Sequence, residues 1–516
     1  MNLEINVTSG RLANVLSEME ERASLVLVLF SGEGLKGAHA DAVDKLTNGL
    51  VSRRVEHDGF DPKFKQTCVI DSDLTVPGLD KIILVGLGQR SKLTLDGLRT
   101  VLAEAFVEAR DRAKSENLVF ALTDVDLRGF TVEQFAEVVA EYAVLADYEP
   151  NHQKTGPWRD EEPQTHFKSL TVLCSRSSLK AARSGVEFGH KLGMATRAAR
   201  DLVNTPADVK TPAWLAKKAA TMAAETDGVV TCKVYGKSDI KRMKMGGVLA
   251  VNRGSASKPV FIVLSYDPPS GATEQVLGLV GKGITFDTGG LNAKDSEGMK
   301  DMKMDMGGAA AVISAMSLLP FIKPQISVRA VIAATDNAIG PKSMQQGDII
   351  KSMSGRTIEV GHTDAEGRLT LCDALHYIQE HCGATKVIDL ATLTGDIETA
   401  VGVFMTGIFG NDARFMKEFM NAADAAGEPM HECPMDETYR DRNKGAMADL
   451  TNDGSGPGHI IAAWFLREFI KDGVAWVHAD IAGTAFRTED LAEGIEAPGG
   501  TGVGVRTLAH LFYNLS

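Results

Sequence analysis

Gly-Lys-Gly-Ile-Thr-Phe-Asp-Thr-Gly-Gly, at residues 281–290, directly follows the apolar segment Val276–Val280. An apolar run without alternation is typical of a strand whose two faces are both covered by helices. Similar segments recur through the second half of the chain, which predicts an α/β domain with a mixed, mostly buried central sheet. The other expected strands are Val230–Tyr235, Val260–Tyr266, Ser327–Ala334, Lys386–Leu390 and Ala475–Asp480, and the expected helices are Trp214–Thr226, Gly307–Leu319, Gly367–His381, Ala413–Ala426 and Ile460–Lys471.

Charged residues gather in the same stretch, which closes with His-Thr-Asp-Ala-Glu-Gly-Arg-Leu at residues 362–369. Carboxylate oxygens without a histidine or cysteine partner suit hard divalent ions, and carboxylates that lie close together need cations to offset their repulsion. We therefore predict a two-metal hydrolase site. Its candidate carboxylates are Asp287, Asp305, Asp364 and Glu366.

Lys282 lies between two glycines after the apolar strand, and two functional explanations compete for it. A phosphate-binding P-loop fails, because position 276 is Val where the first glycine is needed and Gly283 stands where Ser or Thr is needed. A lysine at the carboxyl end of a strand can instead be desolvated, lose its proton and bind a metal. The spacing alone leaves this second function open beside an ordinary structural role.

Asp364 and Glu366 are two residues apart, so on an extended segment both carboxylates would project to the same side. The alternative is an acidic first turn of the helix that Gly367 begins, where Asp and Glu are favoured. Arg368 counts against the alternative, because a cation at that position opposes the helix dipole.

The composition of the whole chain sets further limits. Its 516 residues exceed one ordinary domain, and 55 basic against 68 acidic residues give a net charge of −13. No Lys/Arg run forms the electrostatic footprint of a nucleic-acid-binding protein, so nucleic acid is not an expected partner. Six scattered cysteines without a Cys-x-x-Cys pair suit a reduced compartment. With no basic leader and no apolar run of membrane-spanning length, we expect a cytoplasmic protein without a membrane partner.

Residues 1–165 have the pattern of a separate, smaller α/β domain, which we expect to serve assembly or regulation. Val85-Gly-Leu-Gly88 lacks the third glycine of a dinucleotide fingerprint and is interpreted as a strand-to-helix turn. The polar segment 149–167 predicts a linker or surface excursion, and a connecting segment at 166–194 leads to the larger domain at 195–516. The expected elements before residue 195 are the strands Leu25–Phe30, Gln66–Ile70, Lys81–Val85, Leu118–Ala121 and Leu170–Cys174 and the helices Leu95–Ala113, Thr131–Leu145 and Leu179–Leu202.

The motifs together resemble the leucyl (cytosol) aminopeptidase family of metallopeptidases. The likeness rests on residues 281–290, on Met-Lys-Met-Asp-Met-Gly-Gly-Ala-Ala at 302–310 and on Thr-Asp-Ala-Glu-Gly-Arg-Leu at 363–369. It continues through shorter motifs and covers residues 195–510, which the resemblance makes a catalytic aminopeptidase domain. The implied activity is the removal of N-terminal amino acids, preferably Leu- or Met-like, from peptides with a free N-terminus. The shorter motifs are residues 201–206, 245–250, 391–395, 478–483 and 501–506.

The resemblance implies two divalent ions per subunit, Zn²⁺ and/or Mn²⁺, with Co²⁺ or Mg²⁺ as further possibilities. Lys282, Asp287, Asp305 and Glu366 would hold the tighter ion. Asp287, Asp364 and Glu366 would hold the more exchangeable one. Two such ions activate a shared water and stabilise negative charge that develops on the substrate.

Catalytic and substrate-binding roles are implied in the same way. Lys294 would polarise the scissile carbonyl, and Arg368 would hold a bicarbonate that acts as general base. The pocket for the first side chain, beside the backbone of Leu393, would be lined by Met302, Thr392, Gly395 and Ala482. Taken alone, Met302 and the neighbouring methionines would be core residues at helical spacing.

One position departs from the family pattern, because His362 stands where Asn is usual. Both side chains donate and accept hydrogen bonds, so we expect a tolerated change, with a supporting hydrogen bond or a pH-sensitive neighbour as alternatives. The family further implies a homohexamer. Two other functions stay open: a specialised Cys-Gly or other dipeptide hydrolase, which a panel of dipeptides would reveal, and a DNA-binding or scaffolding member of the same fold, which a salt-dependent gel shift would reveal.

Overall fold

The computed structural model describes residues 3–33, 35, 38–72, 76–122, 129–150, 154–155, 164–492 and 495–516. The chain forms two compact units, Met1–Met194 with Ala492–Ala497, and Ala195–Leu491 with Pro498–Ser516. The division falls inside helix α7 (Leu179–Asn204). Most of the predicted linker at 149–167 lies outside the described residues. That the first unit serves assembly or regulation stays a prediction.

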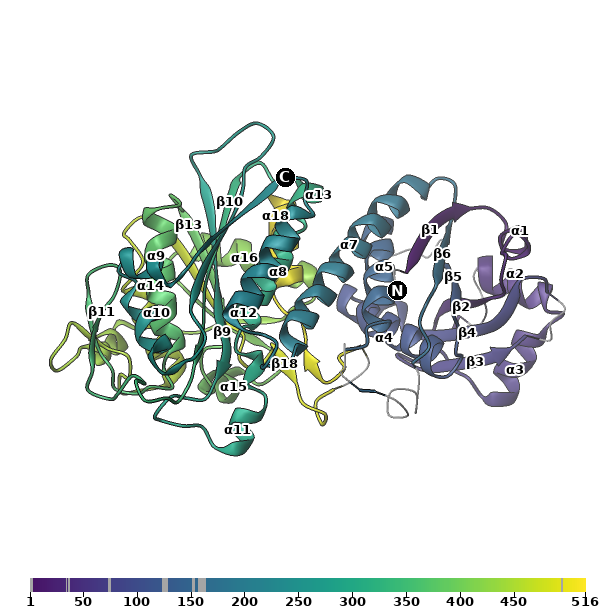
Figure 1. Cartoon of the computed structure of the whole chain (residues 1–516). Coiled ribbons are helices and arrows are strands. Elements are labelled where there is room, and N and C mark those ends of the chain that lie inside the picture. Colours follow the sequence, from purple (N-terminus) through teal and green to yellow (C-terminus); the bar gives the residue numbers. More distant parts are fainter. Residues whose placement is uncertain are drawn as a thin grey trace. The chain divides into compact units, whose positions relative to one another are not determined.

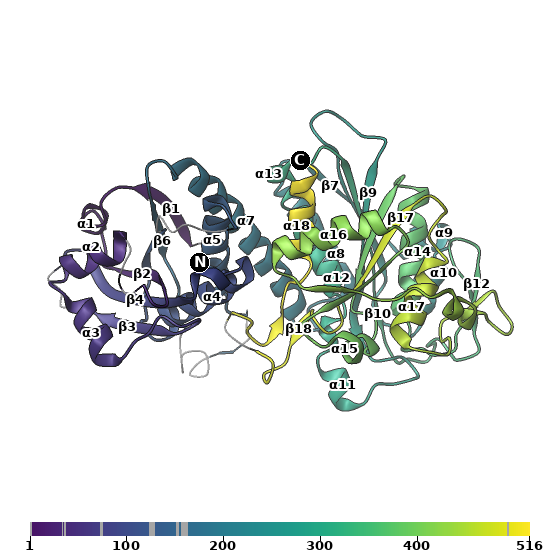
Figure 2. The same cartoon turned by 180° about the vertical axis from the view of Figure 1, so that it is seen from behind.

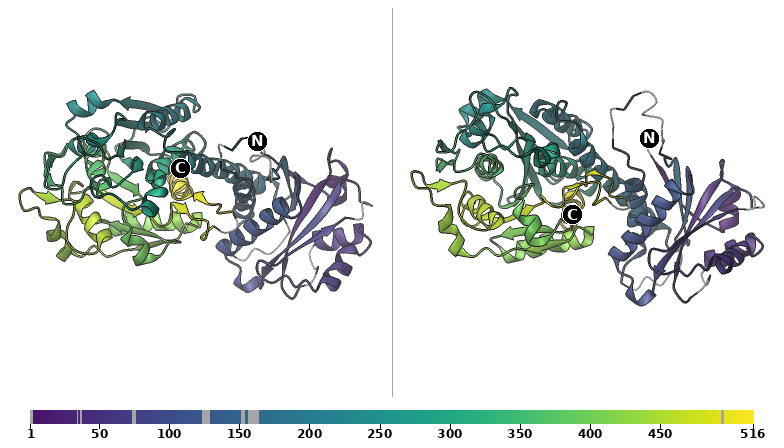
Figure 3. Two further views of the ribbon diagram at one scale, coloured as in Figure 1. Left: turned by 60° about the horizontal axis from the view of Figure 1, so that its bottom comes forward. Right: turned by 90° about the horizontal axis from the view of Figure 1, so that it is seen from below.

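The first unit is built on a six-stranded sheet with helices on both faces, visible as the purple and blue strands of Figure 3. Its strands are β1 (Glu4–Ser9), β2 (Ala23–Phe30), β3 (Thr67–Asp71), β4 (Leu79–Gly88), β5 (Asn117–Ala121) and β6 (Ser169–Cys174). They lie in the order β1-β6-β5-β2-β4-β3, and β3 is antiparallel to β4. The remaining elements are α1 (Leu12–Ser17), α2 (Ala38–Leu46), α3 (Leu50–Asp58), η1 (Arg90–Lys92), α4 (Leu95–Asp111) and α5 (Val132–Ala146).

Strand β2 shows why an unbroken apolar run is a good signal for this fold. Val26 and Val28 enter the core that contains α4 and α5, whereas Leu25 and Leu27 enter the core that contains α1, α2 and α3. Alternate residues of a strand point to opposite faces, so a sheet covered twice needs apolar side chains at every position.

The predicted turn at Val85-Gly-Leu-Gly88 is wrong in its position, because β4 continues to Gly88. Close packing of two backbone segments explains why position 86 is a glycine. A Cβ there would lie 1.9 Å from the carbonyl oxygen of Lys63, so only glycine allows the two backbones to approach this closely.

The second unit is built on an eight-stranded sheet. Its strands are β7 (Val230–Tyr235), β8 (Val260–Tyr266), β9 (Val276–Asp287), β10 (Ser327–Asn337), β13 (Lys386–Ala391), β14 (Thr406–Gly410), β15 (Met430–Glu432) and β17 (Ala475–Asp480). They lie in the order β15-β14-β17-β13-β9-β10-β8-β7. The central strands β17, β13, β9 and β10 are parallel, whereas β14 and β8 run antiparallel to the strands they flank. The predicted mixed, mostly buried sheet is confirmed.

Helices cover both faces of this sheet (Figures 1 and 2). One layer contains α8 (Pro212–Ala224), α12 (Gly307–Met316), α16 (Ala413–Ala426) and α18 (Val505–Asn514), and the other contains α10 (Gly246–Val251), α14 (Gly367–Glu380) and α17 (Gly458–Arg467). Among the described residues, one stretch, Met302–Ile322, is long and apolar enough to cross a membrane by composition, but 83% of its most apolar window is buried inside the protein. Its helix α12 is therefore a core helix.

Shorter elements complete the second unit. Two small sheets lie outside the central one: β11 (Ile349–Lys351), β12 (Thr357–Glu359) and β16 (Leu450–Thr451), and the pair β18 (Phe486–Arg487) and β19 (Gly499–Gly500). The short helices are α9 (Lys237–Arg242), η2 (Asn252–Gly254), α11 (Ser296–Lys300), η3 (Met302–Met304), α13 (Leu319–Ile322), α15 (Asp396–Val401) and η4 (Glu437–Asn443).

Strand β9 is longer than predicted, and this corrects the position of Lys282. The strand was expected to end at Val280, but it pairs with β10 through residue 287, so Lys282 lies inside it. The flanking glycines do not end the strand. A Cβ on Gly281 would lie 2.6 Å from Ala309 of α12, and a Cβ on Gly283 would lie 2.6 Å from the side chain of Ile332. They are needed because the sheet is packed tightly at this point.

Candidate metal centre

The predicted site residues gather at the carboxyl edge of the four parallel strands. Asp287 ends β9, Asn337 ends β10, Asp480 ends β17 and Thr392 directly follows β13. Open α/β sheets bind their ligands at this edge, because loops of different length leave room there. The topology alone therefore selects this edge as the place for a site.

The structure brings together the carboxylate cluster, by which we mean Asp287, Asp305, Asp364 and Glu366. Oxygen atoms of Asp287, Asp364 and Glu366 all lie within 4.8 Å of one another. Asp305 joins them through Lys282, whose Nζ lies 2.7 Å from Asp305 Oδ1 and 3.1 Å from Glu366 Oε1. Residues that are far apart in the sequence thus line one small volume.

The two predicted lysines face different pairs of carboxylates. Lys282 contacts Asp305 and Glu366, whereas Nζ of Lys294 lies 3.0 Å from Asp287 Oδ2 and 2.6 Å from Asp364 Oδ1. The side chain of Lys282 is 4% exposed and that of Lys294 is 19% exposed. Lys294 is therefore the lysine that a bound molecule can reach.

The carboxylate cluster contains more negative than positive groups in a largely buried place. Four carboxylates face two lysines, and burial, with a smaller contribution from the charge of Asp287, raises the pKa of Asp305 to about 6 although Lys282 opposes the rise. Burial and then the charge of Asp287 raise the pKa of Glu366 well above its ordinary value. Burial lowers the pKa of Lys282, but the carboxylates around it outweigh burial and raise it overall. Additional cations would relieve this imbalance.

Unused acceptor atoms also fit a metal. Oδ2 of Asp305 is buried and has no hydrogen-bond partner among the described residues, and the buried Oε1 of Glu366 has the Lys282 ion pair but no hydrogen bond there. Buried polar atoms are rarely left without a partner. Because the donors are carboxylate oxygens with one amine, the residues present fit hard or borderline divalent ions.

The segment before α14 differs from the prediction. Asp364 and Glu366 were expected on an extended segment, but the backbone turns here: Ala365 N donates to His362 O at 3.3 Å, and Glu366 already has helical dihedral angles. The turn, and not strand geometry, brings the two carboxylates together. The alternative of an acidic helix cap also fails, because within residues 164–492 the Glu366 side chain accepts no capping hydrogen bond.

Two asparagines that the sequence did not single out hold the cluster in place. Asn337 Nδ2 donates to Asp287 Oδ1 at 2.8 Å, and Gly289 N donates to the same oxygen at 2.8 Å. Asn452 Nδ2 donates to the carbonyls of His362 (2.7 Å) and Ala365 (3.1 Å), which fixes the turn that carries Asp364. The sequence predicts an end of β10 at Ala334, three residues before Asn337, and the signal for Asn337 as a polar side chain at the end of a central strand comes from the structure.

Arg368 lies in the first turn of α14 with its side chain largely buried. Its Nη1 donates to Asn452 O at 2.9 Å, while Nε is buried and has no partner in the part of the chain that the structure describes. Burial lowers the pKa of this guanidinium, and the largest opposing effect is the charge of Glu366. A buried arginine with an unused donor fits a small planar anion.

Asp480 links two of the residues predicted for the side-chain pocket, Leu393 and Ala482. Its Oδ1 accepts from Leu393 N at 3.1 Å and from Ala482 N at 3.3 Å, so the loops after β13 and β17 meet. Thr392 Oγ1 donates to Asp305 Oδ1 at 2.7 Å, which places this residue beside the cluster. A Cβ on Gly395 would meet no described atom within 4 Å, so space is open beside it. Met302 lies in η3, three residues before Asp305.

His362 is half-buried next to the cluster. Its Nδ1 accepts from Asp364 N at 3.3 Å, so the imidazole supports the turn through its neutral acceptor nitrogen. An Asn side chain has an acceptor oxygen that can serve the same backbone donor.

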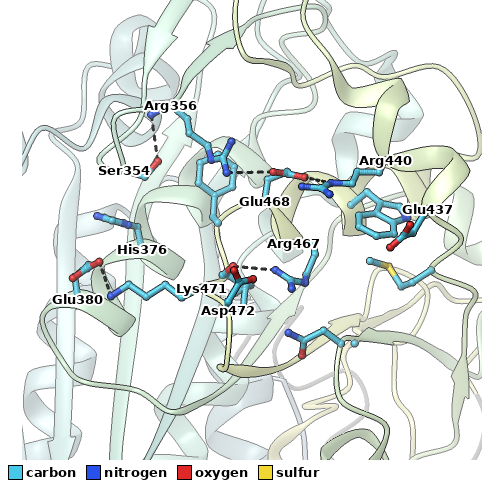
Figure 4. Close-up of a pocket in the computed structure, with 16 residues that line it drawn as sticks. Ser354, Arg356, His376, Glu380, Glu437, Arg440, Arg467, Glu468, Lys471 and Asp472 are labelled. Carbon is cyan, nitrogen blue, oxygen red and sulfur yellow. Dashed lines mark hydrogen bonds and ion pairs between the residues drawn. The ribbon is translucent and has the colours of Figure 1, made fainter.

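A second hollow, of about 660 Å³, is lined by His376 and Glu380 near the end of α14 and by no residue of the carboxylate cluster. Figure 4 shows the residues that line it. Five of its charged groups form ion pairs with one another: Glu468 lies 2.6 Å from Arg440 and 3.3 Å from Arg356, and Lys471 lies 2.6 Å from Glu380. None of the predicted site residues, all of which are described, lines it.

Comparison with known proteins identifies the family. The sequence model described as "Cytosol aminopeptidase family, catalytic domain" matches residues 197–509, and that of the family's N-terminal domain matches residues 26–157. The chain belongs to the cytosol aminopeptidase family. A relative from Alkaliphilus oremlandii, named probable cytosol aminopeptidase, is 36% identical over 512 residues, which cover 99% of this chain and 99% of the relative. A protein of the same name from Bacillus licheniformis is 38% identical, covering 95% and 97%.

Solved structures agree with this membership. A mutant of tomato leucine aminopeptidase superimposes with a TM-score of 0.86 and 31% identity, covering 99% of this chain and 96% of that one. The bottromycin maturation enzyme BotP in complex with Mn superimposes with a TM-score of 0.82 and 31% identity, covering 95% and 99%. The predicted family and the two-part α/β fold are confirmed, and the protein is a hydrolase of the peptidase class.

Proposed function

We propose that this cytosol aminopeptidase family member is a two-metal aminopeptidase that releases N-terminal residues, preferably Leu- or Met-like, from peptides. The observation that carries the proposal is the carboxylate cluster, which gathers four buried or half-buried carboxylates and two lysines at the ligand-binding edge of the sheet. A cluster with this excess of negative charge is costly unless cations bind in it.

Two divalent ions, Zn²⁺ or Mn²⁺ in the first place, would be held by the residues already gathered. When bound, such ions lower the pKa of a shared water and stabilise negative charge on the substrate. Lys282, Asp287, Asp305 and Glu366 would hold one ion, and Asp287, Asp364 and Glu366 the other. Lys282 must be neutral to bind a metal. Cations among the carboxylates would take over the charge balance that its ammonium group provides in their absence.

Lys294 has the geometry of a carbonyl-polarising residue. It is the more exposed lysine, and the charges of Asp287 and Asp364 keep its pKa above the ordinary value against the effect of burial. A protonated amine at the rim of the cluster can donate to a peptide carbonyl and stabilise the oxyanion that develops from it.

Arg368 is the candidate holder of a bicarbonate ion. Its Nη1 is used by Asn452, which fixes the guanidinium plane, and its buried Nε stays available among the described residues. A planar anion held there would be a general base close to the cluster.

The pocket for the first substrate side chain is proposed at Met302, Thr392, Gly395 and Ala482, beside the backbone of Leu393. The open space next to Gly395 and the half-buried thioether of Met302 support an apolar pocket. We further propose a cytoplasmic homohexamer, on the ground of family membership.

Metal analysis combined with turnover of leucine amide tests the proposal. The purified protein should contain up to two divalent ions per subunit. Chelation should abolish turnover, and Mn²⁺, Zn²⁺ or Co²⁺ should restore it. Full turnover by a protein shown to be free of metal would refute the two-metal function. A panel of aminoacyl amides and dipeptides, with Cys-Gly included, then separates a broad aminopeptidase from a specialised dipeptidase.

A further inference from the structure

Lys210 is a buried lysine for which the proposed function has no role. It lies in the loop between α7 and α8, and its side chain is fully buried, with 0% exposed. Its Nζ donates to the carbonyl oxygen of Val203 at 2.7 Å and to that of Lys303 at 2.5 Å. No carboxylate lies within ion-pair distance of Nζ among the residues that the structure describes. Burial, and then the charge of Lys303, lower the pKa of Lys210 to about 7.

A fully buried lysine at this position lowers the stability of the fold relative to an apolar side chain. Burying an amine without a carboxylate partner opposes folding, and an apolar side chain of similar length would avoid that cost. What the lysine adds is two directed hydrogen bonds. One acceptor, Val203 O, belongs to the last turn of α7, where carbonyls lack a helical partner and a positive group is favoured. The other belongs to η3, so Lys210 ties η3 to the end of α7.

Helix η3 connects Lys210 to the site. It begins with Met302, and Asp305 directly follows it. Asp305 is anchored independently, because its Oδ1 accepts from both Lys282 Nζ and Thr392 Oγ1 at 2.7 Å. A shift of η3 would therefore move Met302 more than Asp305.

We propose that Lys210 is a positioning residue for substrate specificity, which fixes the carbonyl of Lys303 and thereby holds Met302 against the first side chain of the substrate. This inference rests on the proposed function, which places Met302 in that pocket. It predicts that Lys210 affects substrate preference and does not affect metal binding.

The test compares Lys210→Met with Lys217→Met, the same substitution at an exposed position of α8. kcat and KM are measured for leucine amide and alanine amide with Mn²⁺ present. The preference for leucine amide in kcat/KM should fall roughly tenfold in Lys210→Met, mainly through KM, since a loosened apolar pocket loses this order of discrimination. Turnover of alanine amide and metal content should stay within about twofold of the unchanged protein, and Lys217→Met should change neither.

A double-mutant cycle with Met302→Ala separates positioning from a general loss of structure. If Lys210 acts through Met302, Lys210→Met should not reduce the preference further when Met302 is already Ala. An equal reduction in both backgrounds, or an equal loss for both amides, would overturn the inference. If Lys210→Met does not fold, as judged by its thermal unfolding, Lys210→Gln replaces it, because its amide keeps a donor of shorter reach. An unchanged protein that hydrolyses neither amide would refute the proposed function and this inference with it, whereas an active protein with either of the equal losses above would refute this inference alone.

Discussion

Two clusters of buried charge lie on the sheet of the second unit, and they are balanced differently. The carboxylate cluster at the carboxyl edge has more negative than positive groups. Between β13 and β17, by contrast, both oxygens of Asp389 are used: Oδ1 lies 2.5 Å from His478 Nδ1, and Oδ2 accepts from Trp476 Nε1 at 2.7 Å. All three side chains are fully buried. Burial lowers the pKa of His478, but Asp389 outweighs burial and raises it overall.

The comparison distinguishes buried charges that stabilise the fold from buried charges that have unused capacity to bind a ligand. Asp389 has a partner for each oxygen, so its carboxylate has no further capacity to bind a cation, and among the described residues the atom of this group without a hydrogen bond is Nε2 of His478. The carboxylate cluster has raised carboxyl pKa values and unused oxygens, which mark a site with spare capacity. Perturbed groups of the second kind are candidates for function, whereas groups of the first kind contribute to stability.

The largest expected effect is on the balanced group. Asp389→Ala leaves His478 and the Trp476 N–H buried without their acceptor, so it should lower the free energy of unfolding by about 3–5 kcal/mol. Trp476→Phe is the comparison that removes one of the two donors: leaving Asp389 Oδ2 buried without it should cost about 1–3 kcal/mol, and the smaller ring adds a cavity cost. Urea unfolding measures both. The metal content of the folded variants should not change. A loss of metal in Asp389→Ala would show that the Asp389 group is not independent of the carboxylate cluster.

The next effect divides the two lysines of the carboxylate cluster. Lys294→Ala should keep both ions and lower kcat for leucine amide by on the order of 10²–10³, the cost of removing one oxyanion donor. Lys282→Ala should lower metal occupancy instead, because its amine lies between Asp305 and Glu366. Metal analysis and kinetics are run on the same preparations. Equal loss of metal in both variants would show that the division of roles is wrong.

A smaller effect should differ in sign between the carboxylate cluster and a buried carboxylate that is fully hydrogen-bonded. In the metal-free protein, Glu366→Gln removes one excess buried charge and should raise the free energy of unfolding by on the order of 1 kcal/mol, the scale of one pKa unit. Glu428→Gln is the matched control, because Glu428 is also buried but accepts from Gly504 N, Thr507 N and Thr507 Oγ1. This control should lose about 1–3 kcal/mol. Thermal or urea unfolding after chelation measures both free energies of unfolding. Destabilisation by both variants would contradict the expected difference in sign.

The smallest effect is expected at His362. His362→Asn keeps an acceptor for Asp364 N, so kcat/KM for leucine amide should stay within about twofold, the change typical of a substitution outside buried features. Saturating Mn²⁺ and a fixed pH of 8 keep metal loading from obscuring the result. A loss of tenfold or more would mean that the imidazole supports the cluster in a way that an amide cannot.

Local sequence signals located six of the eight strands of the large sheet and five of the helices of the second unit. Helix α16 begins and ends where the pattern predicted, because Asp412 caps its first turn by accepting from Phe415 N and Gly427 ends it in the left-handed conformation. The sequence predicts an end of strand β9 at Val280, because Gly281 and Gly283 follow, but the strand continues to Asp287. The two glycines are needed because Ala309 and Ile332 approach them closely, and a local sequence pattern does not reveal such a contact.

The sequence by itself determined the chemistry of this protein. Its motifs contain the carboxylates and lysines of the site, and its apolar runs specify a sheet covered on both faces, because residue type and periodicity are local properties. Tertiary structure alone decided which groups meet. It placed Lys282 within β9, set Glu366 in a turn, and gave Asn337 and Asn452 supporting hydrogen bonds to segments far away in the chain. It also separated the balanced Asp389 from the overcharged cluster, since charge balance depends on burial and on distances between residues that sequence order does not contain.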